Sequence, residues 1–249
     1  MSDTDEIPDL IRGNDIVDRG PSSGVLRVNA VVKCYSSSET SARDREIAAY
    51  QRLTAKGRNP SSYIVEFYGV LDGSPLLRFQ PNGSIRKYRA VRDEPLDVQP
   101  RLHWAEQICM GLQFVHDQGV VHGNLSCRDI YLDSKLNAKV GGFARSSIHD
   151  PEALKTYDAD LDPTPSQGDL FALGSTLFEV MTGRTPFNVE EASEVESRLD
   201  QGHTPWMGDT LFLGEIILEC WHGINTSAND ALRDITFYKN MYRKVLASP

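Results

Sequence analysis

The stretch VVHGNLSCRDIYLD, residues 120–133, decides how the rest of the chain is interpreted. An apolar run leads into His122, polar residues follow, and a second apolar run ends at Asp133. This is the outline of a catalytic loop. The place where a general base is expected holds Asn124, whose amide has no useful proton affinity near neutral pH, and a carboxylate follows at Asp129. The loop therefore predicts either an exchange of acid and amide or a site that has lost its chemistry.

The composition is that of a globular protein with one large domain or two lobes. The chain has 249 residues, of which 40% are hydrophobic and 24% charged. A net charge of −9 argues against non-specific binding to nucleic acid or to anionic membranes. No apolar run approaches the roughly 20 residues that span a bilayer, and the acidic residues 1–10 do not resemble a secretory signal. The scattered cysteines argue against a zinc site, and we expect a cytoplasmic protein with reduced thiols.

The first hundred residues are predicted to form short strands and one helix. The helix is expected over residues 41–57, where apolar side chains recur at helical spacing and Gly57 provides a stop. A tight hairpin is expected at the DGS turn, residues 72–74. Runs of β-branched and aromatic side chains predict strands at residues 14–20, 24–35, 63–71 and 75–80.

The remainder is predicted to be mainly helical. Residues 168–183 are apolar nearly all round, which is typical of a buried central helix. Between residues 144 and 167 lies a polar, proline-bearing loop, and long loops in compact domains usually carry function or are disordered. The other helices are expected at residues 99–119, 191–202, 213–223 and 227–248.

The order of these elements predicts two lobes with a cleft where they join, a common location for a ligand pocket. The strand-rich part comes first, a short connector follows, and the helical part comes last. The expected boundaries are an acidic tail at 1–10, a small lobe at about 11–78, a connector at about 78–83 and a large lobe at about 84–249.

Several segments occur in the order found in protein kinases, and the chain resembles that superfamily, in particular the compact kinase-like proteins of fungi. NAVVKCY resembles the V-A-I-K strand, KVGGFARS stands where K-x-x-D-F-G belongs, and GDLFALGSTLFEVMTG resembles the helix that anchors the large lobe through Asp169. The likeness runs from about residue 11 to about residue 235. It implies an α+β, bilobal protein kinase-like fold, with a small antiparallel β-rich lobe bearing one helix and a larger, mainly helical lobe.

The resemblance assigns four residues to a nucleotide cleft. Lys33 and Glu46 take the places of the ion pair that orients phosphates, Leu77 takes the gatekeeper place, and Phe79 lies in the hinge. The pair has two interpretations, residual nucleotide binding or an architectural contact between helix and strand. The glycine-rich loop of the family is reduced to Gly13 within LIRGNDIV, which weakens the case for phosphate binding.

The resemblance also identifies three degenerate catalytic positions, and we expect none of them to be catalytic. Asn124 replaces the base, and Gly142 replaces the metal-binding carboxylate. Asp129 replaces an amide that holds the second metal, so it is the only candidate metal ligand, but we expect it to approach from the other side of the cleft. His122 is expected to be structural. We predict no metal site and no magnesium-dependent phosphoryl transfer.

These substitutions favour a catalytically inactive pseudokinase. It would act as a protein-binding scaffold, or as an allosteric regulator or decoy in a kinase pathway, with another protein, such as an active kinase, as its partner. The alternative is a repurposed enzyme, or a nucleotide or small-molecule sensor that uses the cleft. In the repurposed enzyme, Arg128 would lower the pKa of the neighbouring Cys127 thiol, but we expect Cys127 to be structural. We expect no required cofactor, and weak, metal-independent nucleotide binding stays open.

The polar loop occupies the place of the family's activation segment. Gly123 stands where a phosphate-binding Arg is usual, so phosphorylation is expected to order this loop little. The candidate acceptors are Ser146, Ser147, Thr156, Tyr157 and Thr164.

Overall fold

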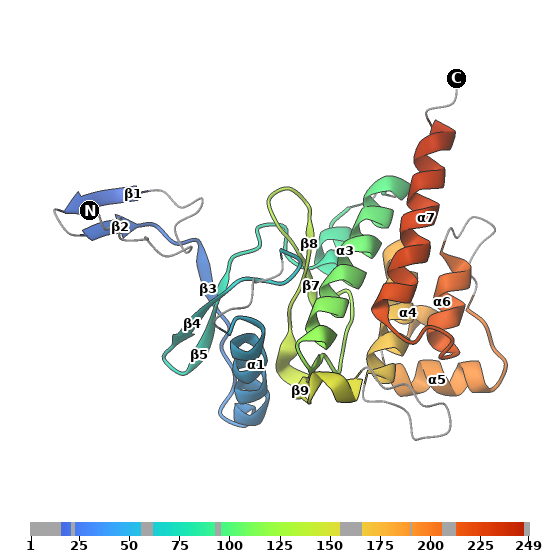
Figure 1. Ribbon diagram of the computed structural model, residues 1–249, viewed down its shortest axis with the longest axis horizontal. Coiled ribbons are helices and arrows are strands. Elements are labelled where there is room, and N and C mark those ends of the chain that lie inside the picture. Colours follow the sequence, from blue (N-terminus) through green and yellow to red (C-terminus); the bar gives the residue numbers. More distant parts are fainter. Residues whose placement is uncertain are drawn as a thin grey trace.

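The computed structural model describes residues 16–20, 23–55, 62–92, 96–154, 166–189, 191–205 and 213–246 of the chain. These residues form two parts that lie side by side along the long axis of the molecule (Figure 1). One part holds a three-stranded sheet and one long helix, and the other is mainly helical. The α+β, two-lobed architecture predicted from the sequence is confirmed.

The small lobe is built on an antiparallel sheet with the strand order β3-β5-β4. In the central strand, Leu77 pairs with Val31 on one side and with Phe67 on the other. The hairpin β1–β2 forms a separate two-stranded sheet that lies apart from these strands, at one end of the molecule (Figure 1). The elements of this lobe are β1 (Ile16–Gly20), β2 (Ser23–Leu26), β3 (Ala30–Val32), α1 (Thr40–Leu53), β4 (Phe67–Leu71) and β5 (Ser74–Arg78).

The strand predicted over residues 24–35 is wrong as a single element. The chain leaves β2 after Leu26 and enters β3 only at Ala30. Between them, the carbonyl of Asn29 accepts a hydrogen bond from the N–H of Phe79 (3.0 Å). This bond fixes the start of β3 against the connector between the lobes, a tertiary contact that a local sequence pattern does not reveal.

The hairpin predicted at DGS is confirmed by the pairing of β4 with β5. Its two turn residues, Asp72 and Gly73, have φ values of 49° and 73°, as the tight turn of a right-twisted hairpin requires. The predicted helix α1 ends earlier than Gly57, because Thr54 closes it. The Thr54 backbone N–H and Oγ1 both donate to the carbonyl of Tyr50, at 2.9 and 2.8 Å.

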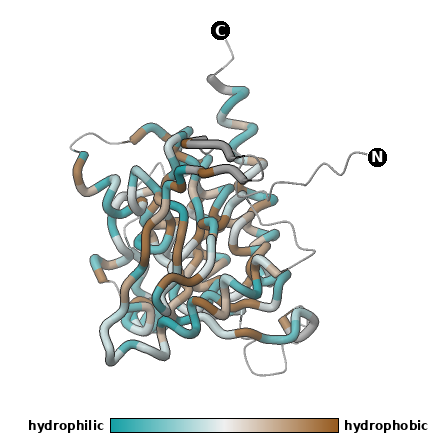
Figure 2. The backbone as a smooth tube through the Cα atoms, turned by 90° about the vertical axis from the view of Figure 1, so that its left-hand side faces the viewer, coloured by the Kyte–Doolittle hydropathy of each residue, from teal (hydrophilic) through white to brown (hydrophobic). Residues whose placement is uncertain are grey.

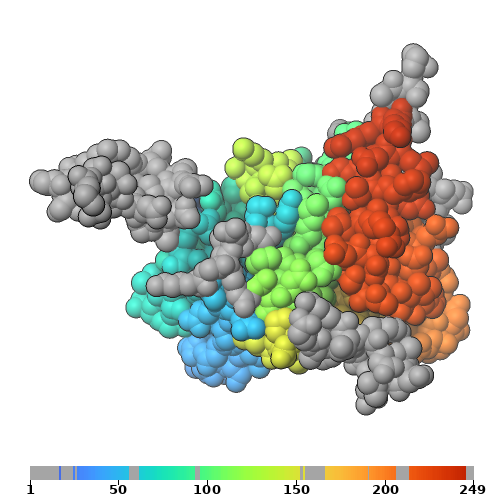
Figure 3. Space-filling model, in the orientation of Figure 1, coloured from blue at the N-terminus to red at the C-terminus, as the bar shows by residue number. Residues whose placement is uncertain are grey.

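The large lobe packs around α4, which is buried on several faces as its apolar sequence predicts. Leu170, Leu173 and Leu177 of this helix are at most 2% exposed. It contacts α3 and α6, and α7 packs against α3, beside which it lies on the face shown in Figure 3. The helices of this lobe are α2 (Ile85–Ala90), α3 (Val98–Asp117), α4 (Gln167–Thr182), α5 (Ala192–Asp200), α6 (Gly214–Trp221) and α7 (Ala228–Leu246).

Hydrophobic stretches run through the body of the molecule, whereas the last turns of α7 extend beyond it (Figures 1 and 2). The apolar side chains of the helices and of the β7–β8 hairpin form one continuous core. Within the described residues, no helix combines the length and apolar character needed to cross a bilayer.

Several short elements escaped the sequence-based assignment. Helix α2 is only one and a half turns long, and its start is marked by Ser84, whose Oγ accepts a hydrogen bond from the N–H of Lys87 (3.3 Å). The short strands pair locally, β6 with β9 and β7 with β8. They are β6 (Val120–Val121), β7 (Ile130–Leu132), β8 (Ala138–Val140) and β9 (Ser147–Ile148). Strands of two or three residues are too short to give a periodic pattern.

Candidate functional site

Asp169, near the start of α4, holds the 120–133 loop in place. Its Oδ2 accepts a hydrogen bond from the N–H of His122 (2.7 Å) and lies 2.8 Å from His116 Nε2, and its Oδ1 accepts from the N–H of Gly123 (2.8 Å). Burial alone would raise the pKa of this carboxyl, but the hydrogen bonds and the neighbouring imidazoles hold the pKa below its ordinary value. The predicted tie between the buried helix and the loop is confirmed.

His122 is a structural residue, as expected. Its ring is fully buried, with Nε2 2.9 Å from the carbonyl oxygen of Gly141 and the ring centre 5.0 Å from that of Phe143. Its Nδ1 accepts a hydrogen bond from the backbone N–H of Asn124 (3.4 Å). The side chain of Asn124 is exposed at the place of the base, and a neutral amide there cannot remove a proton.

Asp129 lies at the end of the loop, just before β7. Its Oδ2 accepts a hydrogen bond from Ser126 Oγ (2.8 Å), its backbone N–H donates to the carbonyl of Ser126 (2.9 Å), and its carbonyl accepts from the N–H of Gly141 (2.8 Å). Burial raises the pKa of Asp129, although the charges of His122 and Lys33 and the Ser126 hydrogen bond act in the opposite direction. The carboxylate is therefore held in one place and is costly to ionise.

The Asp129 carboxylate lies directly beside Gly142. A Cβ placed on Gly142 would lie 2.9 Å from Cγ and 3.0 Å from Cβ of Asp129, and closer still to Oδ1. Gly142 also has φ 78° and ψ 42°, in the left-handed region. The expectation that Asp129 approaches from the other side of the cleft is wrong. Because β7 and β8 are paired strands with Ile130 opposite Val140, the residue before one strand meets the residues after the other.

Lys33 and Glu46 form the expected ion pair. Lys33 Nζ lies 2.6 Å from Glu46 Oε2, and the same oxygen accepts a hydrogen bond from the Tyr35 hydroxyl. The Glu46 side chain is fully buried, and its Oε1 has no hydrogen-bond partner among the described residues. Burial raises the pKa of Glu46, while Lys33 favours the ionised form. Tyr35 was missed, but its place two residues after Lys33 in the strand predicted over residues 24–35 could have revealed it, since alternate residues of a strand share a face.

A row of aromatic rings connects α1 to the GGF segment and to the sheet. The Phe143 ring meets the Tyr50 ring edge-on, with centres 5.0 Å apart, and Tyr50 stacks on Phe67 at 5.3 Å. Burial and the nearby carboxylates raise the pKa of Tyr50 well above its ordinary value, and its hydroxyl has no hydrogen-bond partner among the described residues. The aromatic packing that fixes α1 against residues 141–143 therefore needs no carboxylate at residue 142.

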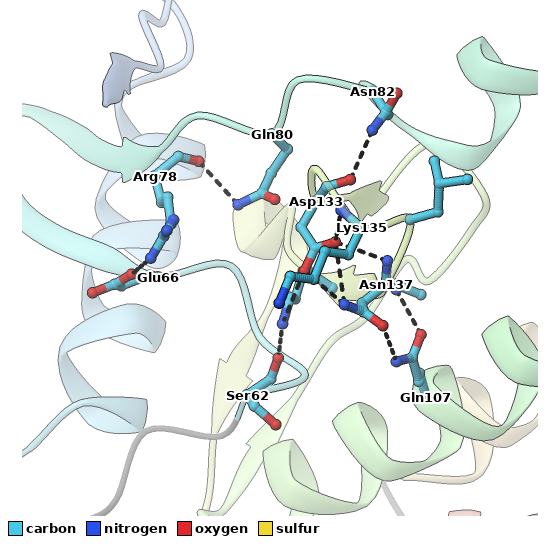
Figure 4. Close-up of polar contacts among 12 residues, drawn as sticks. Ser62, Glu66, Arg78, Gln80, Asn82, Gln107, Asp133, Lys135 and Asn137 are labelled. Atoms are coloured by element: carbon cyan, nitrogen blue, oxygen red, sulfur yellow. Dashed lines mark hydrogen bonds and ion pairs between the residues drawn. The ribbon is translucent and has the colours of Figure 1, made fainter. Parts of the chain in front are cut away.

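The connector between the lobes offers one exposed aromatic ring. Leu77 is 8% exposed and belongs to the core, whereas Phe79 is 42% exposed. Gln80 is buried, its Nε2 donates to the carbonyl of Arg78 (3.2 Å), and its Oε1 has no partner among the described residues (Figure 4). The Arg78 side chain points the other way and pairs with Glu66 at 2.9 Å (Figure 4). Of the two predicted lining residues, Phe79 therefore has the larger accessible surface.

The connector is tied to the β7–β8 hairpin (Figure 4). Asn82 Nδ2 donates to the carbonyl of Asp133 (2.7 Å), and Asp133 Oδ1 accepts from the N–H groups of Lys135 and Asn137, at 2.8 and 2.9 Å. Gln107 of α3 donates to Asn137 Oδ1 (3.1 Å). Burial would raise the pKa of Asp133, but the hydrogen bonds from Asn137 and Lys135 lower it below its ordinary value. The same hairpin positions Asp129, so the connector and the loop form one rigid unit.

The loop that follows the GGF segment is described as far as residue 154. Ser146 is 2% exposed and donates to the carbonyl of Phe143 (2.8 Å), so it is not an accessible phosphate acceptor in this conformation. Ser147 is exposed. The other three candidate acceptors, Thr156, Tyr157 and Thr164, lie outside the described residues.

Cys127 is a structural residue, as expected, and not the reactive thiol of the repurposed-enzyme alternative. The thiol is buried against the carbonyl of Thr176 (3.7 Å), and burial raises its pKa well above the ordinary value. The neighbouring Arg128 is exposed, so adjacency in sequence brings its charge no closer to the sulfur.

The resemblance to kinases implies magnesium in the cleft, and the described residues do not fit it. No group of three or more His, Cys, Asp or Glu side chains within them could hold a metal ion. Gly142 contributes no ligand, and the Asp129 carboxylate fills the space beside it. The glycine-rich segment around Gly13 lies outside the described residues, so the predicted phosphate cradle is not part of this account.

A hollow that the sequence did not predict lies between the 120–133 loop and helices α4 and α5. It measures about 270 Å³ and is lined in part by Asn124, Ser126 and Thr176. At one wall, Arg86 of α2 donates from two nitrogens to the Glu179 carboxylate, at 2.6 and 2.5 Å. This bidentate pair ties α2 to α4.

Comparison with known proteins agrees with this geometry. The family model for protein tyrosine and serine/threonine kinases matches residues 19–229. A relative named probable inactive L-type lectin-domain containing receptor kinase III.1, from Arabidopsis thaliana, is 26% identical over 60% of this chain and 24% of its own length. Mitogen-activated protein kinase kinase kinase 1 from the same plant is 29% identical, over 63% and 29%. Ephrin type-A receptor 8 from Homo sapiens is 23% identical, over 80% and 22%.

The chain spans about a quarter of the length of these curated relatives. The match carries no information on the parts of these relatives that it does not cover. Since the family model covers most of the chain, and the described residues form a two-lobed fold with the Lys33–Glu46 pair and the Asp169-anchored loop in place, the chain belongs to the protein kinase family.

Proposed function

We propose that the chain is a catalytically silent member of the kinase family, a pseudokinase, that acts by binding another protein. It would serve as a scaffold or allosteric regulator of an active kinase, or as a decoy for one. The observation that carries the proposal is the Asp129–Gly142 contact. Residue 142 has no carboxylate for a metal, the space for one is filled by Asp129, and Asn124 stands in place of the base.

The scaffold of the site is intact where its chemistry is missing. Asp169 shapes the loop, Phe143 packs on Tyr50, and Lys33 pairs with Glu46. These contacts support the architecture of the site and do not require turnover. A protein that presents a constant surface to a partner needs them. One relative carries the words "probable inactive" in its name, which is consistent with the loss of activity within this family.

The partner proposal is tested by affinity capture from the native source, followed by mass spectrometry and a functional assay. We expect an active kinase to co-purify with the chain, and its rate of substrate phosphorylation to change when purified chain is added. The Asp169→Asn variant, in which the loop is destabilised, serves as the control for a folded surface. Absence of a kinase from the captured set, or a captured kinase whose rate the chain does not change, would contradict the proposal.

A second candidate function is a nucleotide or small-molecule sensor. It is favoured by the Lys33–Glu46 pair, by two buried oxygens without good hydrogen bonds (Glu46 Oε1 and the Tyr50 hydroxyl), and by the exposed ring of Phe79 at the connector. A thermal-shift series with ATP, ADP and adenosine, with and without Mg²⁺ or Mn²⁺, tests it. A ligand at 100 times its dissociation constant stabilises the fold by about 2.7 kcal/mol, and the absence of any shift would remove this candidate.

The remaining predictions accompany these proposals. A cytoplasmic location and a particular likeness to fungal kinase-like proteins stay predictions, and so do the absence of nucleic-acid partners and of membrane insertion. The net charge of −9 supports the expectation that the partner is not a nucleic acid.

A further inference from the structure

The contact between Asp129 and Gly142 links two substitutions that the sequence presents as separate losses. A Cβ at residue 142 would lie 2.9 Å from Cγ and 3.0 Å from Cβ of Asp129, which is closer than real side chains approach. As long as Asp129 keeps this position, residue 142 must be glycine. A carboxylate therefore lies beside residue 142, and it belongs to residue 129, just before the other strand of the β7–β8 hairpin.

One hydrogen bond holds the Asp129 side chain, and another holds its backbone. Ser126 Oγ donates to Oδ2 at 2.8 Å, and the N–H of Gly141 donates to the Asp129 carbonyl at 2.8 Å. Oδ1, the oxygen that faces Gly142, receives no hydrogen bond from any of the described residues. The cleft thus presents a fixed acceptor that lacks a donor, and a partly buried acceptor of this kind is stabilised by a donor from a ligand.

The cations near this acceptor are already engaged. Lys33 Nζ is 2.6 Å from Glu46, and the Tyr35 hydroxyl donates to the same carboxylate. Arg86, whose charge also acts on Asp129, forms the bidentate pair with Glu179. Among the described residues around this acceptor, the two carboxylates of Asp129 and Glu46 thus face the single lysine Lys33. A phosphate group brought there would meet a net negative charge.

We propose that Asp129 is the specificity-determining residue of this cleft: its carboxylate disfavours phosphate-bearing ligands and selects a ligand that presents a hydrogen-bond donor beside Gly142. Among the described residues, no group of three or more His, Cys, Asp or Glu side chains could hold a metal that would neutralise a phosphate. The inference rests on the second candidate function, that the cleft binds a small molecule, and it names the class of that ligand.

The ligand class is tested with adenosine and with ATP in the presence of EDTA, because the two share a base and ribose and differ in their phosphates. Dissociation constants are measured by calorimetry for the native chain and for Asp129→Asn, with Asp72→Asn as a control at an exposed turn. We expect the native chain to bind adenosine more tightly than ATP. Asp129→Asn should tighten ATP binding on the order of 10- to 100-fold, while adenosine binding stays within a few-fold.

The outcomes separate this inference from the sensor function itself. If both ligands bind and their ratio is the same in the native chain and in Asp129→Asn, the cleft is a sensor but Asp129 does not set its specificity. If neither ligand binds either protein at millimolar concentration, the ligand class assigned here is wrong and the nucleotide sensor falls with it. A native chain that prefers ATP to adenosine without metal also overturns the inference.

The exchange between residues 129 and 142 has a second test that needs no ligand. Gly142→Ala should lower the melting temperature in the native background, since the new Cβ meets Asp129 and since φ is positive. In an Asp129→Ala background the strain of positive φ and the 3.0 Å contact with Cβ remain, but the contacts with Oδ1 and Cγ are removed. We expect the decrease to be smaller there by about 3 °C or more. Equal decreases in the two backgrounds would show that the two residues are not a pair.

Discussion

The carboxylate of Asp169 and the backbone of His122 are joined by a buried hydrogen bond of 2.7 Å, and the neighbouring N–H of Gly123 completes the contact. These hydrogen bonds hold the loop in its shape, and they form whether or not the loop is catalytic. The relationship explains how residues 120–133 retain the outline of a catalytic loop when Asn124 occupies the place of the base.

Replacing Asp169 by Asn should destabilise the fold by about 3 kcal/mol, because one amide cannot accept from two backbone N–H groups and from His116. Urea unfolding measures the change, with Asp72→Asn at the exposed β4–β5 turn as the matched control. A loss below about 0.5 kcal/mol, the scale of an ordinary surface substitution, would show that Asp169 does not anchor the loop.

The stability of the chain should fall in acid partly through Asp169. Its pKa is lowered in the folded state, so its contribution is present above the unfolded value of roughly 3.9 and is lost as the pH falls through the folded value. Unfolding free energies measured between pH 6 and pH 2.5 should therefore decline more steeply for the native chain than for Asp169→Asn. Parallel curves would contradict this assignment.

Asp129 should behave in the opposite way, since burial raises its pKa in the folded state. A raised pKa gives a contribution that is present below the unfolded value of roughly 3.9 and is lost as the pH rises through the folded value. Asp129→Asn removes that loss, so we expect it to stabilise the chain by about 1 kcal/mol at pH 7 and by almost nothing below pH 4. A destabilised variant at pH 7 would mean that the ionised carboxylate is needed by the fold.

Lys33 should stabilise the small lobe even if no nucleotide binds. Lys33→Met leaves the fully buried Glu46 with the Tyr35 hydroxyl alone, and we expect a loss of about 2 kcal/mol, reduced from the value for a fully buried pair because Lys33 is 33% exposed. Thermal unfolding measures this change. In the double variant Lys33→Met/Glu46→Gln most of the loss should be recovered, and a loss equal to the sum of the single variants would contradict an architectural ion pair.

The sequence predicted the elements that have a strong period or a turn signal. The helices α3 and α4 and the β4–β5 hairpin are confirmed, because 3.6-residue periodicity and the DG turn are local properties. The interruption between β2 and β3 was not predicted, since it depends on the bond from Phe79 to Asn29, about fifty residues away in the chain. The end of α1 at Thr54 was missed in favour of Gly57, a stronger but more distant stop signal.

At the site, the sequence identified the residues but not their relation in space. It named Asn124, Asp129 and Gly142, yet it placed Asp129 across the cleft, because the pairing of two three-residue strands could not be inferred from so short a pattern. It expected a structural Cys127 but kept a reactive thiol as an alternative, because adjacency to Arg128 was visible and burial was not. The hydrogen bond from Tyr35 to Glu46, which joins the segment after β3 to α1, was also missed.

The central claim, that this kinase-family chain does not transfer phosphate, is tested most directly by a radiometric assay with γ-labelled ATP. Purified chain is incubated with Mg²⁺ or Mn²⁺ and a mixed protein substrate, and label in protein is compared with that of Asp129→Ala and of a reaction without the chain. The account predicts that all three give the same background. Metal-dependent labelling by the native chain that disappears in Asp129→Ala would contradict it and would make Asp129 a catalytic residue.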